Sequence, residues 1–176
     1  KPYDDYDIIA GQGTAGYEIS QDLANLSITP DIYLCCCGGG GLIAGTSTYL
    51  KYKYPNIKSF AVEPYGFEDT KISLINKKII SNKPGFSSIC DAIITPQPGQ
   101  LTFPINIKTL SGGIVVEDDE VKNSIKILAE HLKIIVEPGG AVAATAALTK
   151  KINLKNKTVV VMISGGNIDL DRFSSL

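Results

Sequence analysis

The stretch that decides the fold is Ile32-Tyr33-Leu34-Cys35-Cys36-Cys37-Gly38-Gly39-Gly40-Gly41-Leu42, in which an apolar run meets four glycines and then a helix-like segment. The apolar run predicts a buried strand. Each glycine adds backbone freedom that folding must remove, about 0.5–1 kcal/mol relative to alanine in a regular element. Packing of a strand against a helix does not by itself require four consecutive glycines. Backbone N–H groups that surround an anion at a helix N-terminus explain the run better.

The glycine run lacks the Lys and Ser/Thr of a nucleotide P-loop, so nothing in it would reach a γ-phosphate or its magnesium. A single terminal phosphate on a cofactor therefore fits the run better than a triphosphate does. The alternative explanation is a glycine-rich turn beneath a crossing segment of the chain.

Apolar runs alternate with helix-period segments along the whole chain, which is typical of a mostly parallel sheet with helices on both faces. The chain is thus expected to be an α/β protein with three layers and a twisted sheet. Residues 79–100 contain several Pro and Gly breakers and are expected to be an extended crossing segment. The predicted strands are 7–10, 32–37, 57–62, 113–116 and 158–163, and the predicted helices are 14–26, 42–54, 67–77, 101–109, 118–132 and 138–150.

The composition excludes several function classes. With 17 basic and 18 acidic residues among 176 and no basic stripe, neither nucleic acid nor a membrane surface is expected as a partner. No apolar run is long enough to span a membrane, and no signal-peptide pattern is present. Cys35, Cys36, Cys37 and Cys90 have neither zinc-site nor disulfide spacing, so we expect buried, reduced thiols in a cytoplasmic protein.

The segment from Gly11 to Gly16 (Gly-Gln-Gly-Thr-Ala-Gly) matches the dinucleotide fingerprint G-x-G-x-x-G and lies between a predicted strand and a predicted helix. The mechanism also needs an acidic residue at the end of the next strand to hold the ribose. That strand ends in Cys37 instead. A tight structural turn is therefore favoured over a nicotinamide site, which stays open as an alternative.

Three further groups of residues are candidates for chemistry. Ser164 ends the last predicted strand, at the edge where open α/β sheets bind ligands, and its hydroxyl can donate to or accept from a ring nitrogen. Glu63, Glu68 and Asp69 follow another strand and could hold a hard cation, although a solvated loop is the simpler explanation. His131, the single histidine, is expected to be a surface or helix-capping residue.

Taken together, these segments resemble the fold type II pyridoxal-phosphate enzymes, in particular the threonine/serine dehydratase and serine racemase group. Six matching stretches occur in the family's order across nearly the whole chain. They are 11–14 (Gly-Gln-Gly-Thr), 38–45 (Gly-Gly-Gly-Gly-Leu-Ile-Ala-Gly), 62–64 (Val-Glu-Pro), 98–104 (Pro-Gly-Gln-Leu-Thr-Phe-Pro), 136–141 (Val-Glu-Pro-Gly-Gly-Ala) and 164–167 (Ser-Gly-Gly-Asn).

The resemblance implies a role for each candidate residue. Gly38, Gly39, Gly40 and Gly41, with the N–H of Leu42, would hold the phosphate of pyridoxal phosphate. Ser164 would contact the pyridine nitrogen, and Glu137 would lie near the ring. Glu63, Phe67 and Asp69 match positions at which some members bind magnesium or calcium.

The resemblance also implies what the chain lacks. The family's Schiff-base lysine and its substrate loop lie upstream, in segments that have no counterpart here, and no lysine of this chain has a matching context. We therefore expect residues 1–176 to be a single cofactor-binding domain fragment, incomplete at its N-terminal side and inactive alone. The intact enzyme would be a homodimer or higher homo-oligomer that converts threonine or serine to a 2-oxo acid and ammonia, or else racemises an amino acid.

Two other function classes stay open. One is a nicotinamide-dependent oxidoreductase built on Gly11–Gly16. The other is a non-enzymatic remnant of the domain that folds and self-associates.

Overall fold

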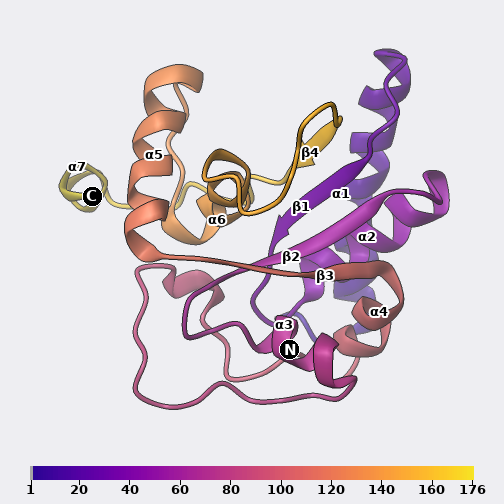
Figure 1. Cartoon of the computed structure of the whole chain (residues 1–176), viewed down its shortest axis with the longest axis horizontal. Coiled ribbons are helices and arrows are strands. Elements are labelled where there is room, and N and C mark those ends of the chain that lie inside the picture. The colour runs from indigo at the N-terminus through magenta and orange to yellow at the C-terminus, as the bar shows by residue number, and fades with distance from the viewer. Residues whose placement is uncertain (1) are drawn as a thin grey trace.

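The computed structural model describes residues 2–176 as one parallel sheet with helices on both sides (Figure 1). Four strands lie in the order β3-β2-β1-β4, and every neighbouring pair is parallel. The strands are β1 (Ile32–Cys36), β2 (Lys58–Pro64), β3 (Leu110–Val116) and β4 (Val159–Val161). The predicted α/β class with a mostly parallel sheet is thus confirmed.

β1 lies inside the sheet, and its five residues are all buried, as a continuous apolar run predicts. Its register brings together segments that are far apart in the sequence. Leu34 pairs with Val161 of β4, and Cys36 pairs with Val62 of β2. The carboxyl ends of these three strands therefore meet at one edge of the sheet.

The helices form the outer layers. In Figure 1, α1, α2 and α4 gather on one side of the sheet, and α5 and α6 lie on the other. α6 is buried along most of its length, and its alanines let it approach the strands closely. The helices are α1 (Tyr6–Asn25), α2 (Gly41–Lys53), α3 (Asp69–Asn76), α4 (Thr102–Thr109), α5 (Asp118–Leu132), α6 (Pro138–Leu148) and α7 (Leu170–Ser175), with a 3-10 turn, η1 (Asp91–Ile93).

One predicted element is wrong. Residues 7–10 are not a strand but the first turns of α1, which starts at Tyr6 rather than at the predicted residue 14. The side chain of Asp5 caps this helix by accepting hydrogen bonds from the N–H groups of Asp7 (2.9 Å) and Ile8 (3.4 Å). Periodicity alone does not distinguish so short an apolar run from part of an amphipathic helix.

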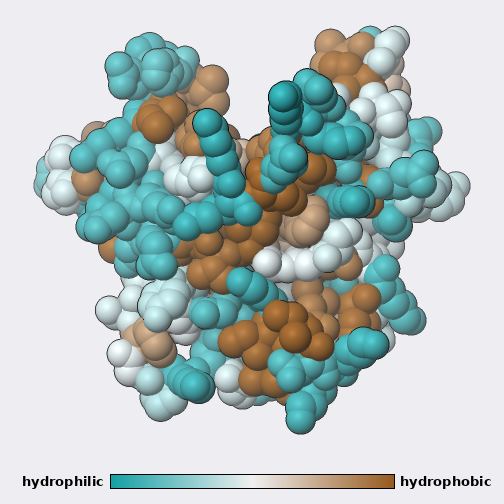
Figure 2. Space-filling view, in the orientation of Figure 1, coloured by the Kyte–Doolittle hydropathy of each residue, from teal (hydrophilic) through white to brown (hydrophobic). Residues whose placement is uncertain are grey.

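The surface carries exposed hydrophobic side chains. Figure 2 shows a hydrophobic band across the middle of one face and a second hydrophobic patch lower on that face. Tyr52 is 80% exposed and Ile75 71% exposed. Within residues 2–176, no helix is both long and apolar enough to cross a membrane.

Candidate cofactor site

The glycine run forms the turn between β1 and α2. Gly40 is the N-cap residue of α2 and has φ of 92°, a left-handed conformation that glycine adopts without strain. No side chain of the described residues caps this helix. The first backbone N–H groups of α2 therefore lack the acceptor that a capping residue would supply, and the positive end of the helix dipole lies at the glycines.

A cavity of about 480 Å³ lies at this turn. Gly38, Gly39, Gly40, Gly41 and Leu42 form part of its wall, as the anion-site prediction requires. The other residues that line it are Pro2, Tyr3, Ile8, Gln12, Cys36, Cys37, Ala92, Ile93, Thr95, Glu137, Gly139 and Ser164.

Close packing also explains the glycines, which the sequence did not reveal. A Cβ on Gly39 would enter the ring of Tyr3, and one on Gly38 would lie 3.0 Å from the carbonyl oxygen of Ile93. A Cβ on Gly40 would lie 2.7 Å from Nδ2 of Asn106. The alternative of a turn beneath crossing chain is therefore correct in part. The cavity and the uncapped helix, rather than the glycines alone, carry the anion-site assignment.

Ser164 lies across the same cavity from the glycine run. The chain beyond β4 stays beside β1, because the N–H of Met162 donates to the carbonyl of Leu34 (2.9 Å). This continuation brings Ser164 next to the end of β1, where the thiol of Cys36 donates to Ser164 Oγ (3.1 Å). The structure thus brings two of the predicted groups, the phosphate loop and the ring-nitrogen partner, to one cavity.

Glu137, the N-cap residue of α6, lines the cavity next to Ser164. Its N–H donates to the carbonyl of Gly165 (3.1 Å), which fixes the turn after Ser164. A Cβ on Gly140 would lie 2.5 Å from that same carbonyl oxygen. The two segments that the resemblance associated with the cofactor ring therefore support one another.

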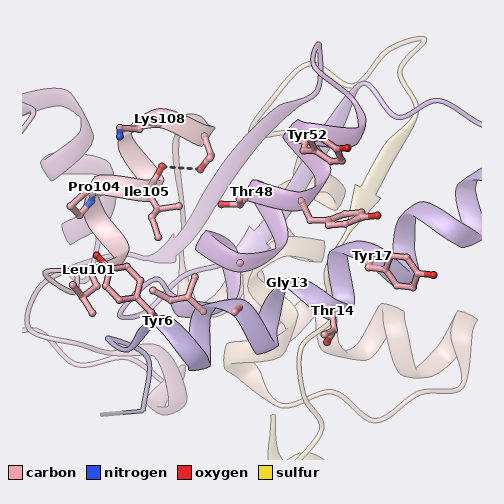
Figure 3. Close-up of a pocket in the computed structure, with 15 residues that line it drawn as sticks. Tyr6, Gly13, Thr14, Tyr17, Thr48, Tyr52, Leu101, Pro104, Ile105 and Lys108 are labelled. Atoms are coloured by element: carbon pink, nitrogen blue, oxygen red, sulfur yellow. Dashed lines mark hydrogen bonds between the residues drawn. The ribbon is translucent and has the colours of Figure 1, made fainter.

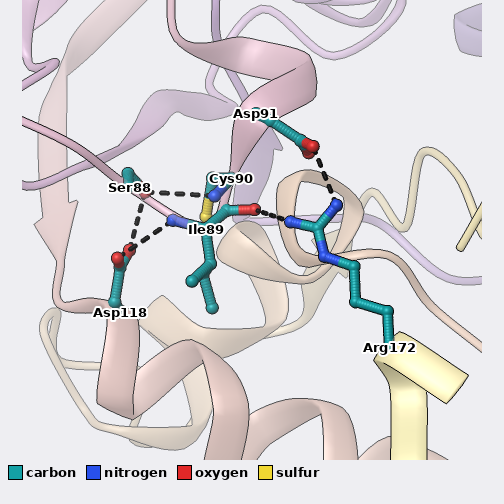
Figure 4. Close-up of polar contacts among 6 residues, drawn as sticks. All are labelled: Ser88, Ile89, Cys90, Asp91, Asp118 and Arg172. Carbon is teal, nitrogen blue, oxygen red and sulfur yellow. Dashed lines mark hydrogen bonds and ion pairs between the residues drawn. The ribbon is translucent and has the colours of Figure 1, made fainter. Parts of the chain in front are cut away.

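The segment around η1 forms another part of the wall, next to α6, and side chains from α5 and α7 hold it in place (Figure 4). Asp118 of α5 accepts from Ser88 Oγ (2.6 Å) and from the N–H of Ile89 (3.0 Å). Arg172 of α7 pairs with Asp91 (2.8 Å) and donates to the carbonyl of Ile89 (3.1 Å). These contacts position the residues that follow, Ala92 and Ile93, against the glycine turn.

The four cysteines are buried free thiols, as predicted. Burial raises the pKa of Cys35 and Cys37 well above the ordinary value and raises the pKa of Cys90 to about 12. Side-chain hydrogen bonding, first with Cys35 and then with Ser164, lowers the pKa of Cys36 despite its burial. Cys36 is therefore the one member of the adjacent trio whose pKa is lowered rather than raised.

The predicted cation ligands lie at the carboxyl end of β2. Glu63 is fully buried, and its two oxygens accept from the N–H groups of Thr70 (2.7 Å) and Lys71 (2.8 Å) at the start of α3. Oδ1 of Asp69 accepts from Asn82 (2.6 Å), whereas its buried Oδ2 has no hydrogen-bond partner. Phe67 lies in the short turn between the two carboxylates, where its N–H donates to Pro64 (3.0 Å).

The two carboxylates are hard to ionise as they stand. Burial, and then the charge of Asp69, raises the pKa of Glu63 well above its ordinary value. Burial raises the pKa of Asp69 to about 7. Residues 2–176 contain no group of three or more His, Cys, Asp or Glu side chains placed to hold a metal. A cation here would need the Phe67 carbonyl or water to complete its ligands, and the hydrogen bonds to α3 give Glu63 a structural role as well.

The Gly11–Gly16 motif does not form a dinucleotide loop. It lies within α1, and the described residues 2–5 before this helix form no strand. Gly13 and Gly16 pack against α2. A Cβ on Gly16 would lie 2.9 Å from the carbonyl oxygen of Thr46, and one on Gly13 3.4 Å from that of Gly45. Because the strand–turn–helix geometry is absent, the motif does not support a nicotinamide site.

A larger hydrophobic groove, of about 1090 Å³, lies between α1, α2 and α4 (Figure 3). Tyr6 and Tyr17 from α1, Tyr52 from α2 and Leu101 and Lys108 beside and on α4 are among its walls. The groove lies on the α1 side of α2, and of the candidate residues only Gly13 and Thr14, from the motif already discussed, line it.

Comparison with known proteins decides the family. A profile described as "Pyridoxal-phosphate dependent enzyme" matches residues 1–165. This chain belongs to the pyridoxal-phosphate-dependent enzyme family. Within it, the chain is 41% identical over 178 residues to a serine racemase of Dictyostelium discoideum, covering 99% of this chain and 53% of that protein.

Two further relatives represent the lyase branch of this family. The catabolic L-threonine dehydratase of Escherichia coli K12 is 35% identical over 99% of this chain and 52% of its own length. The crystal structure of a threonine deaminase from T.th. superimposes with a TM-score of 0.92 at 34% identity, covering 96% of this chain and 60% of that one. The chain therefore spans about half the length of the curated relatives that it matches.

Among residues 2–176, no lysine lines the cavity of the glycine turn. Lys51 and Lys53 lie in the last turn of α2, at the opposite end of the helix from Gly41. Lys1 lies outside the described residues.

Proposed function

We propose that this chain is the cofactor-holding part of a lyase that deaminates threonine, serine or a related hydroxy amino acid to a 2-oxo acid and ammonia. The observation that carries the proposal is the single cavity shared by an uncapped helix N-terminus, at Gly38–Leu42, and the hydroxyl of Ser164. The membership of the family and the lyase relatives support it.

In this proposal each residue has a distinct task. The N–H groups of the glycine turn and of Leu42 bind the phosphate of pyridoxal phosphate, and the dipole of α2 stabilises its negative charge. Ser164, which lines the same cavity, would bind the pyridine nitrogen. When bound, the cofactor supplies the electron sink for carbanion chemistry, and the protein supplies binding and orientation.

A neutral hydroxyl at the ring nitrogen leaves that nitrogen without a carboxylate to keep it protonated. With such a partner the ring would accept less negative charge, which would suit a reaction in which the β-hydroxyl is lost. Serine racemases are among the relatives, so racemisation of serine is the second candidate. Both reactions remove the α-proton, and they differ in whether the hydroxyl leaves.

We propose that the lysine that binds the cofactor and exchanges the proton lies outside residues 2–176. The assay incubates the full native protein that contains this chain with L-threonine and L-serine, and measures 2-oxo acid and D-serine separately. The lyase assignment predicts 2-oxo acid as the main product. D-serine as the main product would favour the racemase, and residues 1–176 alone are expected to form neither.

We further propose that Glu63, Asp69 and the carbonyl of Phe67 bind magnesium or calcium. The buried, unpartnered Oδ2 of Asp69 supports this site, since a cation would satisfy that oxygen and remove the cost of two adjacent buried carboxylates. Calcium is then expected to raise the melting temperature of the native protein but not that of an Asp69→Asn variant. The same rise in both proteins would contradict the site.

We also propose that the protein acts in the cytoplasm as a homodimer or higher homo-oligomer. Four free buried thiols are consistent with a reducing compartment, and the exposed hydrophobic surface is consistent with self-association. Sedimentation equilibrium of the native protein tests the assembly. A monomer at micromolar concentration would contradict it.

A further inference from the structure

Cys36 is the only residue that donates a side-chain hydrogen bond to Ser164 in the part of the chain that the structure describes. Its sulfur lies 3.1 Å from Ser164 Oγ, a close contact for a thiol donor. The two residues are 128 positions apart in the sequence, and both line the cavity of the glycine turn.

The neighbouring thiols point elsewhere. The thiol of Cys35 donates to the carbonyl of Cys36 (3.4 Å), and that of Cys37 lies 3.3 Å from Thr70 Oγ1, near the carboxylates of β2. Alternation along the strand thus directs only the middle thiol of the three to Ser164. Cys36 itself is 5% exposed, so water hardly competes for this contact.

The contact limits what the Ser164 hydroxyl can do. A hydroxyl has one proton to donate and two lone pairs to accept with. When the thiol proton occupies one lone pair, the hydroxyl keeps its own proton for another acceptor. A ring nitrogen without a proton is such an acceptor.

We propose that Cys36 is a positioning residue, whose thiol orients the Ser164 hydroxyl so that it donates to the unprotonated pyridine nitrogen of the cofactor. This inference rests on the proposed function, because it assumes that Ser164 faces the cofactor ring. Cys36 acts through Ser164 and does not itself contact the reacting atoms.

The test uses the full native protein with pyridoxal 5′-phosphate labelled with ¹⁵N in the ring. Binding affinity is measured by calorimetry, and the ring ¹⁵N chemical shift is measured by NMR. In Cys36→Ala the affinity is expected to fall roughly two- to fivefold, the effect of losing one modest hydrogen bond. The ¹⁵N signal is expected to move toward that of a ring nitrogen without a hydrogen-bond donor.

Three further variants separate positioning from packing. Cys36→Ser restores a donor and is expected to recover the wild-type affinity and signal. Cys35→Ala removes a buried thiol from the same strand without touching Ser164, and is expected to leave the ¹⁵N signal unchanged. In a Ser164→Ala background, the additional Cys36→Ala change is expected to move neither quantity.

Several results would overturn the inference. They are an unchanged ¹⁵N signal in Cys36→Ala, an absence of rescue by serine, or an equal effect of Cys36→Ala with and without Ser164. Thermal unfolding of each variant shows whether it is folded, and the serine variant still decides the question if the alanine variant is not. A wild-type protein that binds no pyridoxal phosphate would instead refute the proposed function.

Discussion

Replacing Gly45 with alanine is expected to force α1 and α2 apart. A Cβ at this position would lie 2.6 Å from the backbone nitrogen of Gly13 and 3.0 Å from the carbonyl carbon of Gln12, and it would also overlap the carbonyl oxygen of Ile9. All three atoms belong to the backbone of α1, so no side chain can rotate to relieve the contact. The two helices must move apart instead.

Two opposing effects set the expected change in the free energy of unfolding of Gly45→Ala. Overpacking a well-packed contact costs about 1–3 kcal/mol, and contact with a rigid helix backbone belongs at the upper end. Alanine gains about 1 kcal/mol over glycine in a helix interior. The free energy of unfolding should therefore fall by about 2 kcal/mol in Gly45→Ala.

Gly11→Ala is the matched control, because a Cβ there meets no atom within 4 Å. Gly11→Ala gains the higher helix propensity of alanine without any steric overlap. It should therefore be more stable than wild type by up to about 1 kcal/mol. Urea unfolding followed by circular dichroism should thus separate the two variants by roughly 3 kcal/mol. Equal stability of the two would refute the packing explanation of the motif. A loss of NAD(P) binding in Gly11→Ala would revive the dinucleotide alternative.

The remaining predictions concern buried groups and the wall of the cavity. Without divalent cations, stability should decline as the pH rises from about 4 to 7, because unfolded Asp69 ionises near 3.8 and folded Asp69 near 7. The contribution of Asp69 is on the order of 4 kcal/mol. Urea unfolding should show a smaller decline in Asp69→Asn, in which buried Glu63 still contributes; an unchanged decline would assign the effect to groups other than Asp69. Cys35 and Cys37 should resist a thiol reagent until the protein unfolds, whereas modification at the rate of a free thiol would contradict their burial. Asp118→Ala should cost about 1–3 kcal/mol by leaving the N–H of Ile89 unpaired. Arg172→Ala should cost less than Asp118→Ala because its ion pair is exposed, and the reverse order in urea unfolding would contradict this account of the wall.

Much of the fold could be predicted from local pattern. The boundaries of α5 agree with the prediction, and those of α2, α4 and α6 differ by at most two residues. These helices carry clear start signals, such as the acidic first turn of α5 and the proline of α6. The start of α1 was missed, because its apolar residues form too short a run to show a period.

The sequence predicted which residues belong to the candidate site, but not the contacts between them. The sequence indicated that the glycine turn and Ser164 belong together, but not that Tyr3 and Ile93 cover the glycines. Nor did it indicate that Cys36 would meet Ser164. These contacts join residues that are distant in the chain, and only the strand register brings them together. No local pattern contains that information.

The central claim is that the glycine turn binds the phosphate of the cofactor. Its most direct test is calorimetric titration of the native protein with pyridoxine 5′-phosphate, which carries the phosphate and ring but no aldehyde to react with surface lysines. Gly40→Asp places a side chain and a negative charge at the turn, where φ is 92° and Asn106 lies close, and Gly11→Asp is a control on the exposed face of α1. The account predicts saturable binding that Gly40→Asp abolishes and Gly11→Asp retains. Binding of equal strength in both variants, or no binding by the wild-type protein, would contradict it.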